Sequence, residues 1–378
     1  MKAYQLYAAI SFSLLIPLKS FTQDSIRFDG QLSSWVHFNP SNDLPVWLGG
    51  RYLPALNYGI NLQHDKLIDF EASANMNGSF GVNPFDSSYV RGAIKPYRLW
   101  ARYSARQIEI RAGLQKINFG SAAILRPLMW FDQVDPRDPL MFTDGVWGIL
   151  GRYYLLNNAN IWLWGLYGNQ YRKGWEAFGS NKFVPEFGGR IQLPVPRGEA
   201  GFSYHHRNAD CIIMSDTLGN NVPENRYGFD AKFDAVVGFW VEASWSDYSK
   251  NIGIYSSQEI INLGADYTFG IGNGLAVTYE QLIAAYDRNP FEFENSLTFS
   301  LLHFSYPVGM FDNLSFIAYY DWTNNKSYNF LNWQRQFNKF SMYLMGYINP
   351  KEYNIPTQGS DEILFAGSGV QLMFVFNH

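Results

Sequence analysis

Alternation of apolar and polar residues is the feature that most constrains this chain. Between residues 26 and 38 the even positions are mostly apolar and the odd positions mostly polar. The same period of two returns at 51–63, 68–77, 226–234 and 237–246. In a β-strand, successive side chains point to opposite faces, so this pattern gives each segment one apolar and one polar face. The sequence therefore predicts a series of amphipathic strands and an all-β fold.

Composition separates a membrane barrel from a soluble sheet protein. Aromatic residues make up 18% of the chain and charged residues only 16%, whereas soluble domains carry about 25% charged residues. The apolar faces often end in Tyr or Trp, as the aromatic girdles of membrane barrels do. Beyond the N-terminus, apolar runs fall short of the ~18 residues of a spanning helix. We predict a transmembrane antiparallel up-and-down β-barrel, with a soluble all-β protein as the alternative.

Connections of two lengths alternate along the chain. Short links near 64–66 and 104–107 alternate with long ones such as 121–145 and 169–184. Roughly eight short and nine long links join about 18 strands, with both termini on the periplasmic side and the long links outside. Sixteen strands remain possible, because residues 295–306 and 328–336 alternate poorly.

Both ends of the chain indicate a route to the bacterial outer membrane. Lys2 followed by the apolar segment Ala8–Leu18 is typical of a secretory signal peptide, so we expect residues 1–23 to be removed and 24–378 to form the barrel. The last strand resembles the terminal strand that the barrel-assembly machinery recognises in outer-membrane proteins. The residues that carry this resemblance are Gly369, Leu372, Phe374 and Phe376.

The segment 114–154 (LQKINFGSAAILRPLMWFDQVDPRDPLMFTDGVWGILGRYY) is the most distinctive. It resembles porin-like barrels of the Bacteroidota outer membrane and, more loosely, alginate-export-type porins, over roughly 40 residues. The resemblance rests on a glycine-ended strand followed by Arg126–Pro127 and by 135–139, Asp-Pro-Arg-Asp-Pro. It implies an inward-folded loop after the fifth strand. The apolar residues of the loop independently require cover, which the lumen supplies.

Opposite charges are expected to meet where this loop narrows the lumen. The charged residues of the predicted constriction loop are Arg126, Asp132, Asp135, Arg137, Asp138 and Asp144. The arginines predicted on the lumen wall are Arg98, Arg102, Arg111, Arg152 and Arg190. Their pairing would either only pin the loop or also create a field that selects solutes by charge and dipole.

Three lumen-facing tryptophans, Trp35, Trp100 and Trp240, are candidates for stacking against sugar rings; the alternative is that they pack under inward-folded loops. Enzymatic chemistry is not expected. Ser203 and His205 share a strand face, but no other feature supports a nucleophile and base pair. We predict no catalytic residue, metal or cofactor, and we interpret the lone Cys211 as a thiol in a surface loop.

The predicted function is an outer-membrane porin that passes small hydrophilic solutes, oligosaccharides among the candidates. The alternative is a non-conducting barrel that serves as a scaffold in an envelope complex for secretion, assembly or polysaccharide export. The expected partners are membrane lipid, the assembly machinery, solutes and, in the alternative, other envelope proteins. A formal net charge of −4 argues against nucleic acid.

Overall fold

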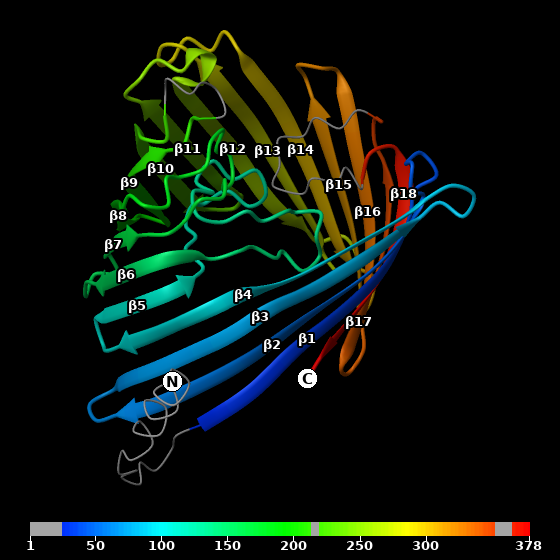
Figure 1. The fold of residues 1–378 in the computed structure, drawn as a ribbon, viewed down its shortest axis with the longest axis horizontal. Helices are drawn as coiled ribbons and strands as arrows, with labels where there is room; N and C mark the ends of the chain where they lie inside the picture. Colours follow the sequence, from blue (N-terminus) through cyan, green and yellow to red (C-terminus); the bar gives the residue numbers. More distant parts are fainter. Residues whose placement is uncertain (1–24, 213–218, 352–364) are drawn as a thin grey trace, which may run out of the picture.

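The computed structural model of the protein describes residues 25–212, 219–351 and 365–378. The predicted signal peptide, residues 1–23, lies outside the described residues. The chain forms one antiparallel sheet of 18 strands that closes on itself through pairing of β1 with β18 (Figure 1). This confirms the predicted barrel and settles the strand number at 18 rather than 16.

The strands follow one another around the barrel in chain order. The first nine are β1 (Ser25–Phe38), β2 (Val46–Leu62), β3 (Lys66–Val82), β4 (Ser88–Ser104), β5 (Ile108–Gln115), β6 (Val146–Tyr154), β7 (Asn160–Leu166), β8 (Glu186–Val195) and β9 (Gly198–Ala209). The others are β10 (Val222–Asp234), β11 (Gly238–Tyr248), β12 (Ser257–Phe269), β13 (Leu275–Asp287), β14 (Ser296–Pro307), β15 (Asp312–Asp321), β16 (Lys326–Gln336), β17 (Phe340–Ile348) and β18 (Ser368–Asn377). In the described ranges the only helical element is the short turn η1 (Gly253–Tyr255), and no helix there is long and apolar enough to cross a membrane.

The period-two pattern separates an outer from an inner face. On β1, Ile26 and Phe28 are 74% and 55% exposed, whereas Ser33 and His37 on the other face are buried. Outward rings pack side by side across strands, with ring centroids of Tyr204 and Tyr227 5.5 Å apart. The apolar residues therefore form the outer band, and polar residues point into the barrel.

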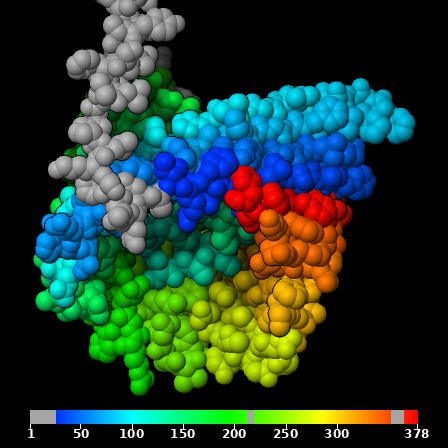
Figure 2. Space-filling view, turned by 90° about the horizontal axis from the view of Figure 1, so that it is seen from below, coloured from blue at the N-terminus to red at the C-terminus, as the bar shows by residue number. Residues whose placement is uncertain are grey.

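The wall is uneven in height. β2, β3 and β4 have 17 residues each, whereas β5 has 8 and β7 has 7. β4 pairs with β3 along its whole length but with β5 only from Leu99 to Ser104. The end of the β3–β4 hairpin consequently projects sideways past the rest of the wall (Figures 1 and 2).

Candidate functional site

The segment between β5 and β6, residues 116–145, lies inside the barrel (Figure 1) and is called the lumen loop below. Buried Glu280 on β13 accepts backbone N–H groups from Ala123 at 2.8 Å and from Leu125 at 2.6 Å, and that of Ile124 at 3.2 Å. Seen from below, the ring of strands surrounds a hollow with teal-coloured chain in its depth (Figure 2). This confirms the inward-folded loop predicted after the fifth strand.

A second buried carboxylate holds the same loop. Glu242 on β11 accepts the N–H groups of Ala122 at 2.8 Å and Leu128 at 2.7 Å. The Trp130 indole donates to Ser244, 2.9 Å away. Buried carboxylates and buried N–H groups both need partners, and here each satisfies the other. Sequence reasoning placed Glu242 on a polar strand face but did not assign this role to it or to Glu280.

Apolar packing fills the lumen on the side of these anchors. Leu128, Trp130 and Phe131 pack against inward residues of β6 and β7 such as Leu150 and Trp164. Leu125 packs against a second cluster of inward residues from β12 to β17. The loop therefore fills the barrel beside β6, β7 and β12–β17 and leaves a space beside β1–β4.

A second segment, residues 167–185 between β7 and β8, also folds inward, where the sequence predicted only a long link on the outer side of the membrane. Its Glu176 forms ion pairs with buried Arg207 at 3.2 Å and Arg226 at 2.8 Å. Trp175 donates to the backbone carbonyl of Arg126 at 2.8 Å. Two lumen-facing arginines on β9 and β10 hold this glutamate inside the barrel, and Trp175 of the same segment contacts the lumen loop.

The acids of the lumen loop divide into two groups. Asp132 pairs with Arg126 at 2.8 Å and Asp135 with Arg137 at 2.5 Å, both within the loop. Asp138 and Asp144 instead reach the wall. Asp144 lies 2.6 Å from the Lys95 ammonium, and Asp138 lies 4.0 Å from the Arg51 guanidinium. An acidic loop does face a basic wall, but through Arg51 and Lys95.

The predicted wall arginines have other partners. Arg102 binds Asp69 at 2.6 Å, and Arg190 binds Asp230 at 2.5 Å. Glu109 forms ion pairs with both Arg111 at 3.2 Å and Arg152 at 3.5 Å. Arg98 contacts the loop through the Thr143 carbonyl, 2.9 Å away, rather than through an acid. The predicted pairing of these arginines with loop acids was wrong, because nearby wall carboxylates or a loop carbonyl already accept their hydrogen bonds.

A cavity of about 330 Å³ lies between the lumen loop and the wall of β1–β4. Cations at its border come from Arg51, Arg91 and Lys95 on the wall and from Arg137 on the loop. The acids, Asp135, Asp138 and Asp144, all come from the loop. The remaining lining residues are Ser33, Trp35, Asn75, Gln133, Leu140, Phe142, Thr143, Phe365, Gln371 and Met373.

Asp138, the acid closest to Arg51 in the cavity, has a raised pKa. Burial raises the pKa of the Asp138 carboxyl above its ordinary value, while the Leu140 N–H and the Arg51 charge act in the opposite direction. The Arg51 guanidinium also lies 4.2 Å from the centre of the Phe142 ring. The boundary of the cavity thus combines a cation held over an aromatic face with a carboxyl that takes up a proton more readily than a solvated aspartate.

The three candidate stacking tryptophans lie in different surroundings. Trp35 lines the cavity. The Trp100 ring is flanked by Arg111 at 4.8 Å and Arg102 at 5.4 Å. Trp240 is 1% exposed, so a sugar cannot reach its face. Of the three, only Trp35 borders this cavity.

The disfavoured enzyme site is not assembled. Ser203 accepts a hydrogen bond from Arg190, while His205 contacts Trp164 through one ring nitrogen and Glu186 through the other. Within residues 25–212, 219–351 and 365–378, no group of three or more His, Cys, Asp or Glu is placed to hold a metal ion. Cys211 is buried rather than at the surface.

The last strand completes the wall. β18 pairs with β1 from Asn377 opposite Gln31 to Val370 opposite Phe38. Phe374 and Phe376 are about 40% exposed on the outer face, with the partly buried Leu372 on the same side, while Gly369 lies against the Tyr347 ring. These residues sit where a terminal recognition strand is expected.

No family model and no curated protein sequence matches the chain. Its fold is similar to that of solved outer-membrane proteins. Acinetobacter baumannii OccAB2 aligns with a TM-score of 0.57 at 7% identity, over 95% of this chain and 99% of that one. A. baumannii OccAB1 gives 0.56 at 9% identity, over 95% and 97%. Pseudomonas aeruginosa OccK5 (OpdH) gives 0.55 at 10% identity, over 94% and 97%. At such identities the likeness concerns the fold.

Proposed function

We propose that the protein is an outer-membrane channel that admits small hydrophilic solutes through a lumen narrowed by the lumen loop. The observation that carries this proposal is the charged cavity between the loop and β1–β4. An 18-stranded barrel encloses more space than its own side chains fill, and the apolar residues of the loop pack against β6, β7 and β12–β17 but leave a cavity beside β1–β4. The similar fold of Occ proteins supports the proposal.

Selection in this channel would act on charge and dipole. Wall cations at Arg51 and Lys95 face loop acids at Asp138 and Asp144. A solute in the gap would experience a field directed across the pore, which favours solutes whose own charges match it. Trp35 offers one aromatic face at the same place, so an oligosaccharide is a narrower version of the same proposal.

Export and assembly belong to the proposal as well. Residues 1–23 would direct the chain across the inner membrane, and 24–378 would form the mature barrel. The outward aromatics of β18 would be read by the barrel-assembly machinery. Kinship with porin-like barrels of the Bacteroidota rests on the sequence of the lumen loop.

Single-channel recording of the purified protein in planar bilayers tests the function. We expect discrete conductance steps, and larger steps after deletion of Trp130–Phe142, because that deletion removes much of the loop. Heat-modifiable migration on gels verifies that each barrel is folded. If neither folded protein conducts, the channel proposal fails and the scaffold alternative replaces it.

A further inference from the structure

The upper half of β4 has a neighbour on one side only. Residues Ser88–Arg98 pair with β3, but pairing with β5 begins at Leu99. In the described part of the chain, no backbone hydrogen bond links 88–98 to any other element. Residues 88–94 therefore present a row of N–H and C=O groups along a free edge, whereas further along Pro96 has no N–H and the Tyr97 carbonyl accepts a hydrogen bond from the Arg98 guanidinium. Unpaired strand edges readily pair with another chain.

The same stretch is exposed on both faces. Every residue from Pro84 to Ile94 is exposed, with Phe85 at 97%, Val90 at 72% and Ile94 at 75%. A spanning strand needs ~9–11 residues, which Lys95–Ser104 already supplies, so Ser88–Ile94 extends past the spanning part. An open edge is not tolerated in hydrocarbon. Its projection from the wall (Figures 1 and 2) leaves it accessible to a neighbouring molecule.

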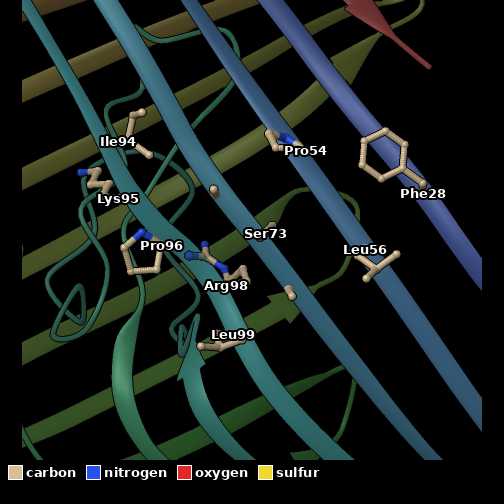
Figure 3. A pocket seen from close by; sticks show the side chains of 11 residues that line it. Phe28, Pro54, Leu56, Ser73, Ile94, Lys95, Pro96, Arg98 and Leu99 are labelled. Carbon is tan, nitrogen blue, oxygen red and sulfur yellow. The ribbon is translucent and has the colours of Figure 1, made fainter. Parts of the chain in front are cut away.

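An apolar groove begins beside this edge. It has a volume of about 490 Å³ and crosses the outer face from β1 to β4. Figure 3 shows Pro54 and Leu56 on one side of Ser73 and Pro96 and Leu99 on the other. The β3–β4 register shifts at Ser73/Ala74, and neither proline has an N–H to donate. The outer face next to the free edge is thus both apolar and hollowed.

We propose that the free edge of β4 binds an extended segment of a partner polypeptide, which adds as a further strand. Main-chain pairing would provide affinity, and alternate side chains would provide specificity. Residues 88–98 contain three basic residues and no acid. Apolar side chains of the partner would meet Val90 and Ile94, and acidic ones would face Arg91 and the solvent-accessible Lys95, whose exposed pair with Asp144 is weak.

A phosphorylated lipid headgroup would also meet Arg91 and Lys95, but it could not use a row of main-chain groups. The polypeptide is therefore the favoured occupant. The inference does not depend on conduction by the barrel, because pairing along the edge uses main-chain groups and the outward side chains of Val90 and Ile94, although Arg91 and Lys95 also border the cavity.

The test uses the full chain in nanodiscs of zwitterionic phosphatidylcholine and a fluorescent peptide of alternating valine and glutamate. We expect saturable binding by fluorescence anisotropy and slower amide exchange in 88–96. Methylation of alternate peptide nitrogens should weaken binding at least about tenfold, equivalent to about 1.4 kcal/mol. A peptide of alternating valine and lysine should also bind more weakly.

Two variants act on the edge itself. Gly92→Pro removes a backbone donor, and Val90→Glu keeps the backbone but opposes an acidic partner. Both should lose binding, while Val236→Glu in the opposite turn should not; heat-modifiable migration verifies folding of all three. Absence of peptide binding, or equal binding of the methylated peptide, would overturn the proposal. The proposal would also be overturned if the protein bound anionic lipid vesicles through Arg91 but did not bind the peptide.

Discussion

Glu280 offers the sharpest test of how the lumen loop is held. Its carboxylate accepts hydrogen bonds from three consecutive backbone N–H groups, those of Ala123, Ile124 and Leu125, and it is completely buried. Glu280→Ala leaves all three donors without this partner. The strand ladder of β13 is made by main-chain groups, so the barrel should still form.

The magnitude follows from the contacts. Hydrogen bonds to a charged group are worth about 1.5–3 kcal/mol each, and neighbouring bonds do not add fully. Two of the three bonds are short, at 2.8 and 2.6 Å. We therefore expect the docked loop to lose roughly 3–6 kcal/mol, which lowers the docking equilibrium about 10²–10⁴-fold. Glu280→Gln, which keeps one acceptor oxygen, should lose less.

Trypsin provides the assay, because Arg137 lies in the loop and is 8% exposed when docked. Cleavage after Arg137, followed by mass spectrometry on folded protein, should be slow in the parent and fast in Glu280→Ala. Glu71→Ala is the matched control, since Glu71 shares a hydrogen bond with Ser73 of its own strand and none with the loop. If the loop of Glu280→Ala stays as protected as that of the control, the carboxylate does not anchor it.

Three further predictions follow from the charged cavity and from the two faces of the wall. Because its pKa is raised, Asp138 takes up a proton at a higher pH than an ordinary aspartate, so mild acidification should shift the reversal potential in the direction of anion selectivity before other acids titrate. Asp138→Asn should show the same shift already near neutral pH, and an unchanged reversal potential would refute the prediction. Leu56→Arg should destabilise the barrel by roughly 2–4 kcal/mol if the residue lies at the bilayer midplane. Asn57→Arg can pair with Asp29 and should have little effect on the urea midpoint of unfolding. Equal losses of stability in the two variants would contradict the assignment of outer and inner faces. Ser87→Cys should react with an impermeant thiol probe on intact cells, and Asn157→Cys should not. The native Cys211 should contribute little labelling, because burial raises the pKa of its thiol to about 11. The reverse labelling would invert the topology.

The wall was predictable from the sequence because strand period is a local property. A residue such as Phe28 shows its face through its immediate neighbours, and the same holds for most strands, whereas 295–306 and 328–336 alternate poorly and left the strand number open. The inward loop was predictable from apolar residues such as Trp130 that had no other cover. Asp230 shows the limit of this local reasoning: the strand period places it on the polar face, but its burial with Arg190, two strands away, depends on the fold.

The ion pairs inside the lumen could not be predicted, because they depend on long-range structure. Which arginine meets which acid depends on register and on the path of a loop, and neither is encoded locally. Glu242 and Glu280 were missed because a carboxylate that binds backbone N–H groups needs no particular residue type opposite it. The free edge of β4 was likewise hidden, since it results from the length of β5 rather than from β4 itself.

Anchorage of the lumen loop through main-chain groups has an evolutionary consequence. Glu242 and Glu280 bind the backbone of 122–128, so they hold that segment whatever side chains it carries, provided the N–H groups remain. The acids that border the cavity lie further along, in 135–144. In the proposed channel, substitutions there would change which solutes pass, while the hydrogen bonds to Glu242 and Glu280 keep the loop docked. Permeability would then vary in small steps among barrels that all retain the docked loop.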